Sequence, residues 1–86
     1  MSKNKTIYDK RYQSLISELT KERVRFSISQ DELAASVGLN QSDISKIEKF
    51  EKRLDVLELS MILRALRINE NVRLQRIVKE FTGVPE

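Results

Sequence analysis

The chain has 86 residues, of which 40% are hydrophobic and 34% charged, and it contains no cysteine and no histidine. This length predicts one domain with a small core. The composition excludes disulfides and thiolate nucleophiles, and it removes the commonest general base and metal ligand. No apolar run approaches the ~20 residues of a membrane span, and no apolar stretch follows Met1, so we expect no signal peptide. We therefore expect a cytoplasmic protein that is not an enzyme and needs no metal, cofactor or small-molecule ligand.

The net charge of +3 is spread unevenly along the chain. Residues 1–25 hold seven basic and three acidic residues, residues 26–60 hold four and seven, and residues 61–86 hold five and three. A basic excess is compatible with a polyanion partner, but a solvated basic surface explains it as well. We expect residues 1–5 to be a flexible basic arm and residues 6–86 to be a single domain.

Helix-breaking residues are scarce, since glycine occurs at positions 38 and 83 and proline at 85 only, which predicts an all-α fold. The first helix is expected from Ile7 to Arg25, with Thr6 and Asp9 as a weak capping box. Arg23 continues its apolar stripe and therefore needs a partner. The stripe itself consists of Tyr8, Tyr12, Leu15, Ile16 and Leu19.

Three later segments share one N-terminal pattern, in which a capping residue precedes an acid by three positions and an apolar pair flanks both. The pattern predicts helices over 30–37, 41–50 and 56–66. Gly38 is expected to end the second helix, leaving a three-residue turn before the third. A fifth helix is expected over about 70–82, capped by Asn69 and stopped by Gly83 and Pro85.

Two short helices joined by a glycine-initiated turn form a helix-turn-helix over residues 30–49. A generic corner between two helices would meet the same packing demands. The outer face of the third helix favours the first interpretation, because it carries small polar and basic groups suited to base edges in the major groove. With Ile44, Ile47 and Glu51 turned inward, that face consists of Gln41, Ser42, Ser45, Lys46 and Lys49.

The stretch SQDELAASVGLNQSDISKIE, from Ser29 to Glu48, resembles the Cro/phage-repressor helix-turn-helix family, also called the xenobiotic-response-element family. The resemblance covers roughly residues 10–68. The segment EKRLDVLEL, residues 51–59, resembles the ERRLDVVEL segment of small bacterial members. The resemblance implies a five-helix lambda-repressor-like domain that binds double-stranded DNA as a bacterial or prophage regulator of transcription.

The resemblance also assigns roles to individual residues. Gln41, Ser42, Ser45 and Lys46 would read bases, and Gln30 would contact a phosphate and support Gln41. Arg23 would pair with Glu48 near the end of the third helix. Further phosphate contacts would come from Asn40, Lys49, Lys52 and Arg53.

Two positions depart from the family pattern. Ser27 stands where many members have a glycine after the first helix, and Phe50 replaces the small residue or glycine that usually follows the third helix. We expect local loop geometry to differ at these points while the fold is kept.

A single helix-turn-helix reads about 4–6 base pairs, so we expect a homodimer on a palindromic operator with half-sites ~34 Å apart. The expected function is repression of transcription. The open alternatives are the antitoxin of a toxin–antitoxin pair and a helical protein–protein adaptor that does not bind DNA. The dimer residues are expected on the fifth helix, unless that helix packs within the subunit, and are Leu74, Ile77, Val78 and Phe81.

Overall fold

The computed structural model describes residues 7–83, and the predicted basic arm, Thr6 and Pro85 lie outside this range. Within it the fold is all-α, as predicted for a five-helix lambda-repressor-like domain. The elements are α2 (Lys10–Arg25), α3 (Gln30–Val37), α4 (Gln41–Glu48), α5 (Val56–Ala65), the 3₁₀ turn η1 (Ile68–Glu70) and α6 (Val72–Thr82).

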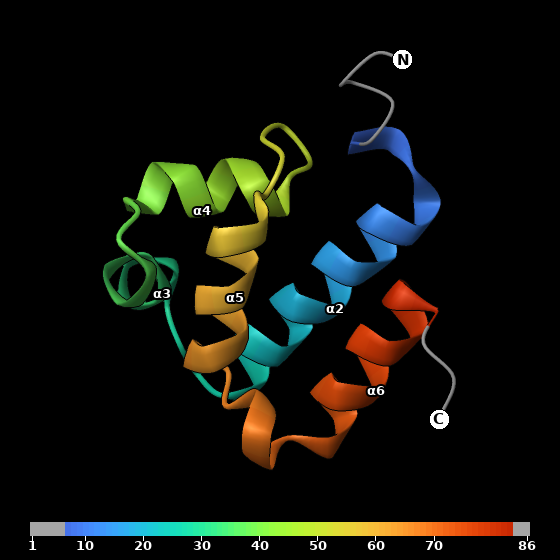
Figure 1. The fold of residues 1–86 in the computed structure, drawn as a ribbon. Coiled ribbons are helices and arrows are strands. Elements are labelled where there is room, and N and C mark those ends of the chain that lie inside the picture. The colour runs from blue at the N-terminus through green and yellow to red at the C-terminus, as the bar shows by residue number, and fades with distance from the viewer. Residues whose placement is uncertain (1–6, 84–86) are drawn as a thin grey trace.

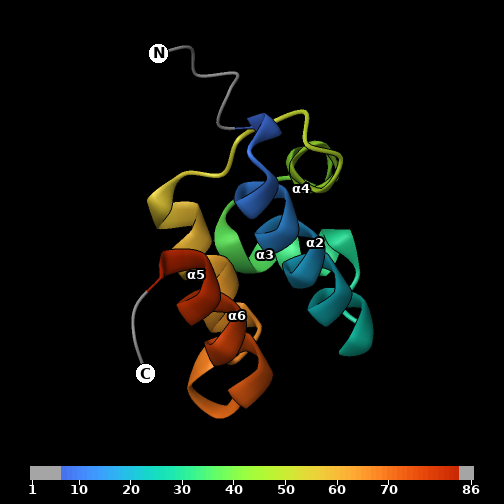
Figure 2. The same ribbon diagram turned by 90° about the vertical axis from the view of Figure 1, so that its right-hand side faces the viewer.

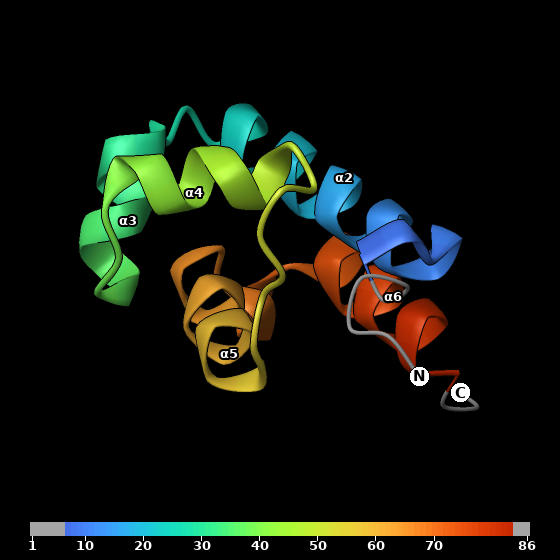
Figure 3. The same cartoon turned by 90° about the horizontal axis from the view of Figure 1, so that it is seen from above.

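The helices divide into two packed groups (Figure 1). Helix α3 packs against both α4 and α5, and α6 lies beside α2. The same pairing of α2 with α6 is visible from the side (Figure 2). Seen from above, α4 lies across one edge of the molecule, away from α6 (Figure 3). Helix α4 is therefore a peripheral element held by its inner face.

One hydrophobic core joins all five helices. Ala34 on α3 is only 2% exposed, and α3 packs against both α4 and α5. Leu66 and Leu74 are fully buried and attach α5 and α6 to the remaining helices. The rest of the core consists of Tyr12, Leu15, Ile16, Leu19, Leu33, Val37, Ile44, Ile47 and Ile62.

Local signals in the sequence set the helix starts. Ser29, Asn40 and Asp55 cap α3, α4 and α5, and in each case the acid three residues later completes a capping box. These reciprocal bonds involve only residues within one turn, so the sequence pattern suffices to predict them. Gly38 ends α3 in the left-handed conformation, with φ +71°, as predicted.

The start of the first long helix differs from the prediction. Asp9 is the N-cap of α2, and its carboxylate accepts from the backbone N–H groups of Arg11 and Tyr12. Ile7 and Tyr8 are helical, but Asp9 interrupts the helix after them. Tyr8 is 72% exposed, so its assignment to the apolar stripe was wrong, because the break at Asp9 removes it from the register of α2.

Three helix ends are made by residues other than glycine. Ser27, Phe50 and Arg67 have φ of +57°, +64° and +61°, and they follow α2, α4 and α5. Phe50 therefore stops α4 at Glu48, two residues before the predicted end, and Arg67 follows an α5 that ends at Ala65. The two departures from the family pattern, at positions 27 and 50, keep the left-handed turn that glycine favours.

The last helix begins later than predicted. The turn η1 occupies Ile68–Glu70, so Asn69 is not the cap and α6 starts at Val72. Asn71 performs the capping, since its Oδ1 accepts from the N–H of Leu74 at 3.0 Å. Both asparagines are competent caps, and the packing of the preceding turn decides between them.

Candidate nucleic-acid interface

Helix α4 has a buried inner face and an exposed outer face. Ile44 and Ile47 are 1% and 3% exposed and fix the helix against the core. Glu51 lies beyond the end of α4 and is exposed, so its predicted inward position was wrong. On the outer side Gln41, Ser42, Lys46 and Lys49 are exposed and Ser45 is half-buried. The structure thus brings together the predicted base-reading residues on one surface.

A chain of hydrogen bonds connects this surface to α2. The guanidinium of Arg23 donates from Nε to Glu48 Oε2 at 2.7 Å and from Nη2 to Glu48 Oε1 at 3.0 Å. Gln30 Nε2 donates to the same Oε1 at 2.8 Å. Gln41 Nε2 then donates to Gln30 Oε1 at 2.6 Å. We call these four side chains the hydrogen-bond chain.

The pair formed by Arg23 and Glu48 is mostly buried, with 12% of each side chain exposed. Arg23 also donates from Nη1 to the carbonyl oxygen of Ile28 at 2.8 Å, which connects it to the loop between α2 and α3. The structure therefore contains the ion pair expected from the resemblance. It joins the C-terminal end of α4 to α2 and to the loop that precedes α3.

A second ion pair closes the segment that follows α4. Lys52 Nζ donates to Asp43 Oδ1 at 3.1 Å, and this bond is the main cause that lowers the pKa of the Asp43 carboxyl. Lys52 was predicted as a phosphate contact, and here its charge compensates the carboxylate beside the outer face of α4. Asp43 also accepts from the Asn40 N–H at 3.3 Å.

The other predicted phosphate residues lie around the start of α4 and beyond its end. Asn40 uses its Oδ1 to cap the Asp43 N–H at 2.9 Å, which leaves its amide nitrogen as a donor. Lys49 and Arg53 are exposed. Gln30 is half-buried at the first position of α3, where helix N–H groups favour an anion.

The predicted dimer residues on α6 do not form one exposed stripe. Leu74 is fully buried in the core of its own subunit, so its assignment to a dimer interface was wrong. Helix α6 packs against α2, and the intramolecular packing of this helix explains the error. Ile77 and Phe81 pack partly against the core, and Val78 is half-buried.

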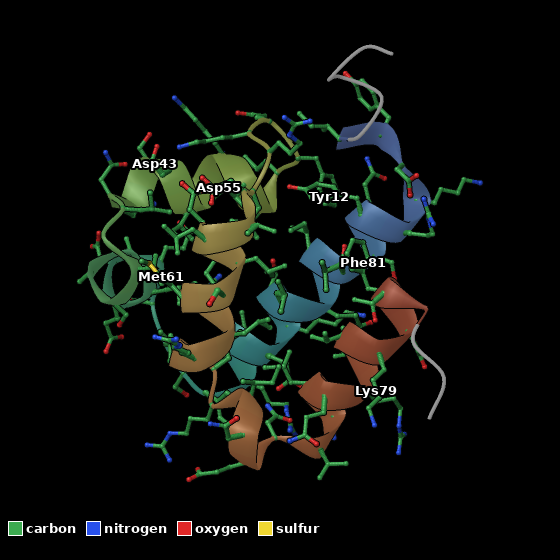
Figure 4. The ribbon with its side chains drawn as sticks, viewed as in Figure 1. Tyr12, Asp43, Asp55, Met61, Lys79 and Phe81 are labelled. Atoms are coloured by element: carbon green, nitrogen blue, oxygen red, sulfur yellow. The ribbon has the colours of Figure 1, made fainter. Side chains whose placement is uncertain are left out.

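An open groove of about 490 Å³ lies between α2 and α6. Leu15, Ile77 and Phe81 give it apolar lining. The side chain of Phe81 lies on the α2 side of α6, whereas Lys79 points away (Figure 4). The charged lining residues are Lys10, Arg11, Glu18, Arg73, Arg76 and Glu80.

The roles of two important side chains were not identified from the sequence. The first is Glu22, which is 2% exposed. Its carboxylate oxygens form ion pairs with Nε of Arg25 at 3.2 Å and with Nε of Arg73 at 3.7 Å. It lies three residues after Leu19, on the continuation of the buried stripe, and that spacing could have identified it. The prediction instead continued the stripe at Arg23 and passed over Glu22.

The second is the hydroxyl of Tyr12, which accepts from the Leu54 N–H at 2.9 Å and holds the segment between α4 and α5. Tyr12 lies at the upper end of α2, near that segment (Figure 4). Burial raises the pKa of its phenol. No local pattern relates positions 12 and 54, so this contact could be found only from the structure.

Among residues 7–83 there is no group of three or more acidic, histidine or cysteine side chains arranged to hold a metal ion. None of the helices in this range is both long and apolar enough to cross a membrane.

The sealed inner face, the glycine turn and the polar outer face of α4 define a DNA-binding helix-turn-helix. Comparison with protein families agrees, because the model described as helix-turn-helix matches residues 19–72, more than half of the chain. The chain belongs to the Cro/C1-type helix-turn-helix family, the xenobiotic-response-element family of DNA-binding domains. None of the curated proteins compared with it matches.

Proposed function

We propose that the protein is a sequence-specific regulator of transcription that binds a palindromic operator as a homodimer, with α4 in the major groove. The observation that carries the proposal is the outer face of α4, which exposes Gln41, Ser42 and Lys46 while Ile44 and Ile47 are sealed in the core. A rigidly held helix of ~10–12 Å diameter suits the major groove.

The proposed base contacts follow from side-chain chemistry. Gln41 pairs with the N6 and N7 edge of adenine, Lys46 with O6 or N7 of guanine, and Ser42 and Ser45 adapt to either base. Phosphate contacts come from the amides of Gln30 and Asn40 and from the exposed cations on and after α4, and they set register and most of the affinity. These cations are Lys49 and Arg53, with Lys52 shared between Asp43 and the DNA.

We include a homodimer in the proposal because one α4 contacts too few base pairs to define a genomic site, whereas two subunits related by a two-fold axis read twice as many. The proposed interface consists of the exposed parts of Ile77 and Phe81, which line the groove between α2 and α6, together with the half-buried Val78 on α6. We propose repression as the outcome, because a dimer bound across a promoter blocks the DNA that it covers. The site of action is the nucleoid.

The first test is selection of bound duplexes from a random DNA pool, followed by affinity titrations of the selected and a scrambled duplex at two salt concentrations. The proposal expects a palindromic sequence bound at least ~10³-fold more tightly than the scrambled control. Sedimentation of the free protein and of the complex gives the number of subunits. Equal, weak binding to both duplexes that disappears with salt would contradict the proposal and favour the protein–protein adaptor.

A further inference from the structure

The side chain of Tyr12 on α2 reaches the loop between α4 and α5, where its hydroxyl accepts from the Leu54 N–H at 2.9 Å. We propose that Tyr12 is a positioning residue for DNA binding, because this bond directs the neighbouring Arg53 toward a phosphate of the duplex. The inference rests on the proposed function, in which Arg53 contacts the DNA backbone. It makes a buried residue of α2 a determinant of DNA affinity.

The loop that carries Arg53 is fixed on both sides of this residue. On one side the N–H of Lys52 donates to the carbonyl oxygen of Lys46 on α4 at 3.2 Å. On the other side Leu54 packs its side chain partly against the core, and Tyr12 holds its N–H. Arg53 is exposed between these two points. The backbone of the loop, and not packing of the arginine side chain, therefore sets the direction of Arg53.

One hydrogen bond at Leu54 is enough to set this direction because the peptide bond is planar. The N–H of Leu54 lies in the same plane as the carbonyl group of Arg53, so a fixed N–H fixes the orientation of that plane. The orientation of the plane determines the angle ψ of Arg53. That angle sets the direction in which the arginine side chain leaves the loop.

The surroundings of Tyr12 make it a firm anchor. The residue is 7% exposed, so the core holds its ring in place. It lies at the upper end of α2, beside the loop (Figure 4). Burial raises the pKa of its phenol, so the hydroxyl stays neutral near pH 7, and the positive charge of Arg53 opposes this rise. Arg53 is thus close enough to Tyr12 for its charge to act on the phenol.

Tyr12→Phe removes the hydroxyl and keeps the ring. The Leu54 N–H then loses its acceptor, which is unfavourable at a half-buried position unless the N–H turns toward water. A pocket of about 200 Å³, lined in part by Tyr12, Arg53 and Leu54, gives the peptide unit room for this turn. The Leu54 side chain stays against the core, so we expect the fold to be kept while Arg53 loses its fixed direction.

The experiment measures the affinity of the full chain for the selected and the scrambled duplex over a series of salt concentrations. Each neutralised phosphate contributes about 0.9 to the slope of log K against log salt. Arg53→Gln should therefore reduce the slope by about 0.9 per subunit, so that a fourfold rise in salt weakens the parent about 3.5-fold more than this variant. Tyr12→Phe should reduce the slope by at least half as much, with an unchanged ratio of affinities for the two duplexes.

The double variant separates positioning from a general structural role. If Tyr12 acts through Arg53, adding Tyr12→Phe to Arg53→Gln causes no further loss of affinity or of slope. A general structural role would weaken binding by the same factor with and without the arginine. Equal factors in both backgrounds therefore overturn the inference, and so does a Tyr12→Phe variant that keeps the slope of the parent.

Tyr8→Phe is the matched control, because it removes the same hydroxyl from a residue that is 72% exposed and precedes α2. It should leave affinity and slope unchanged. An Arg53→Gln variant with the slope of the parent would show that Arg53 contacts no phosphate, and it would overturn the inference alone. Equal binding of the parent to both duplexes contradicts the proposed function instead, because the salt slopes still report the phosphate contacts.

Hydrogen exchange in the free protein tests the bond itself. The Leu54 N–H should be protected in the parent and should lose this protection in Tyr12→Phe. The Glu58 N–H, which donates to Asp55 Oδ1 at 2.7 Å, is the internal reference and should keep its protection in both proteins. An unprotected Leu54 N–H in the parent would overturn the inference without any measurement on DNA.

Discussion

The molecule holds two charged clusters at helix contacts, and they are built in opposite ways. Where α2 meets α4, Arg23 and Glu48 form an ion pair in which each side chain is 12% exposed. Where α2 meets α6, Glu22 is 2% exposed, but its partners Arg25 and Arg73 are 49% and 60% exposed. In the first cluster both charges are buried, whereas in the second only the carboxylate is.

This difference indicates what each cluster contributes. A pair with both charges buried has one favourable arrangement, because each charge has lost its water and depends on the other. It therefore positions α4 and the Gln41 amide. Arg25 and Arg73 are largely exposed, so each can break its contact with Glu22 and be solvated by water instead. We therefore expect this cluster to tolerate movement of α6. The more closely fixed of the two clusters is therefore the one that holds α4, the helix proposed to read DNA.

The largest expected effect comes from Arg23→Ala, which leaves Glu48 mostly buried without its cation. We expect a loss of about 2–3 kcal/mol in the free energy of unfolding, below the 3–5 kcal/mol of a fully buried pair. DNA affinity should also fall, because α4 loses its connection to α2. Urea unfolding and duplex titrations measure the two effects. A variant with unchanged melting and unchanged affinity would show that the pair positions nothing.

The next comparison removes the carboxylate from each cluster by substitution with leucine. Glu48→Leu leaves Arg23 buried and should destabilise the protein by about 2 kcal/mol. Glu22→Leu releases Arg25 and Arg73 into water and fills the site with an apolar side chain, so we expect a gain of about 1 kcal/mol. Urea unfolding of both variants tests the opposite signs. Destabilisation of similar size in both would remove the distinction between the clusters.

A smaller effect is expected at the loop that leads from α2 toward the first cluster. Ser27 is exposed and holds φ +57°, which disfavours side chains other than glycine. Ser27→Gly should therefore raise the free energy of unfolding by about 0.5–1 kcal/mol, with some of the relief offset by greater freedom in the unfolded chain. Ser27→Ala is the control and should change stability little. Equal stability of all three proteins would show that the turn carries no strain.

The sequence predicts those parts of the fold that depend on neighbouring residues. The three capping boxes and the Gly38 turn involve contacts within a few positions, so the starts of α3, α4 and α5 are predictable. The choice of Asn71 over Asn69, and the burial of Leu74 and Glu22, depend on how α6 packs against α2. In the site, the residue types were enough to predict which side chains form the outer face of α4. The directions of the Gln30 and Gln41 amides could be found only from the structure.

The smallest effect is that of acid on the capping boxes at the starts of α3 and α4. Hydrogen bonds lower the pKa of Asp43, chiefly through Lys52, and of Glu32, chiefly through the Ser29 N–H. A carboxyl whose pKa is lower in the folded state stabilises the fold above its unfolded pKa, and this contribution disappears as the pH falls through the folded value. Stability should therefore be lost below about pH 4.

Because the chain has no histidine, no side chain with an ordinary pKa titrates between pH 5 and 8, and stability should be nearly constant there. Asp43→Asn and Glu32→Gln should each flatten the acid limb slightly, and thermal melting as a function of pH measures this. Loss of stability between pH 5 and 8 would contradict this expectation.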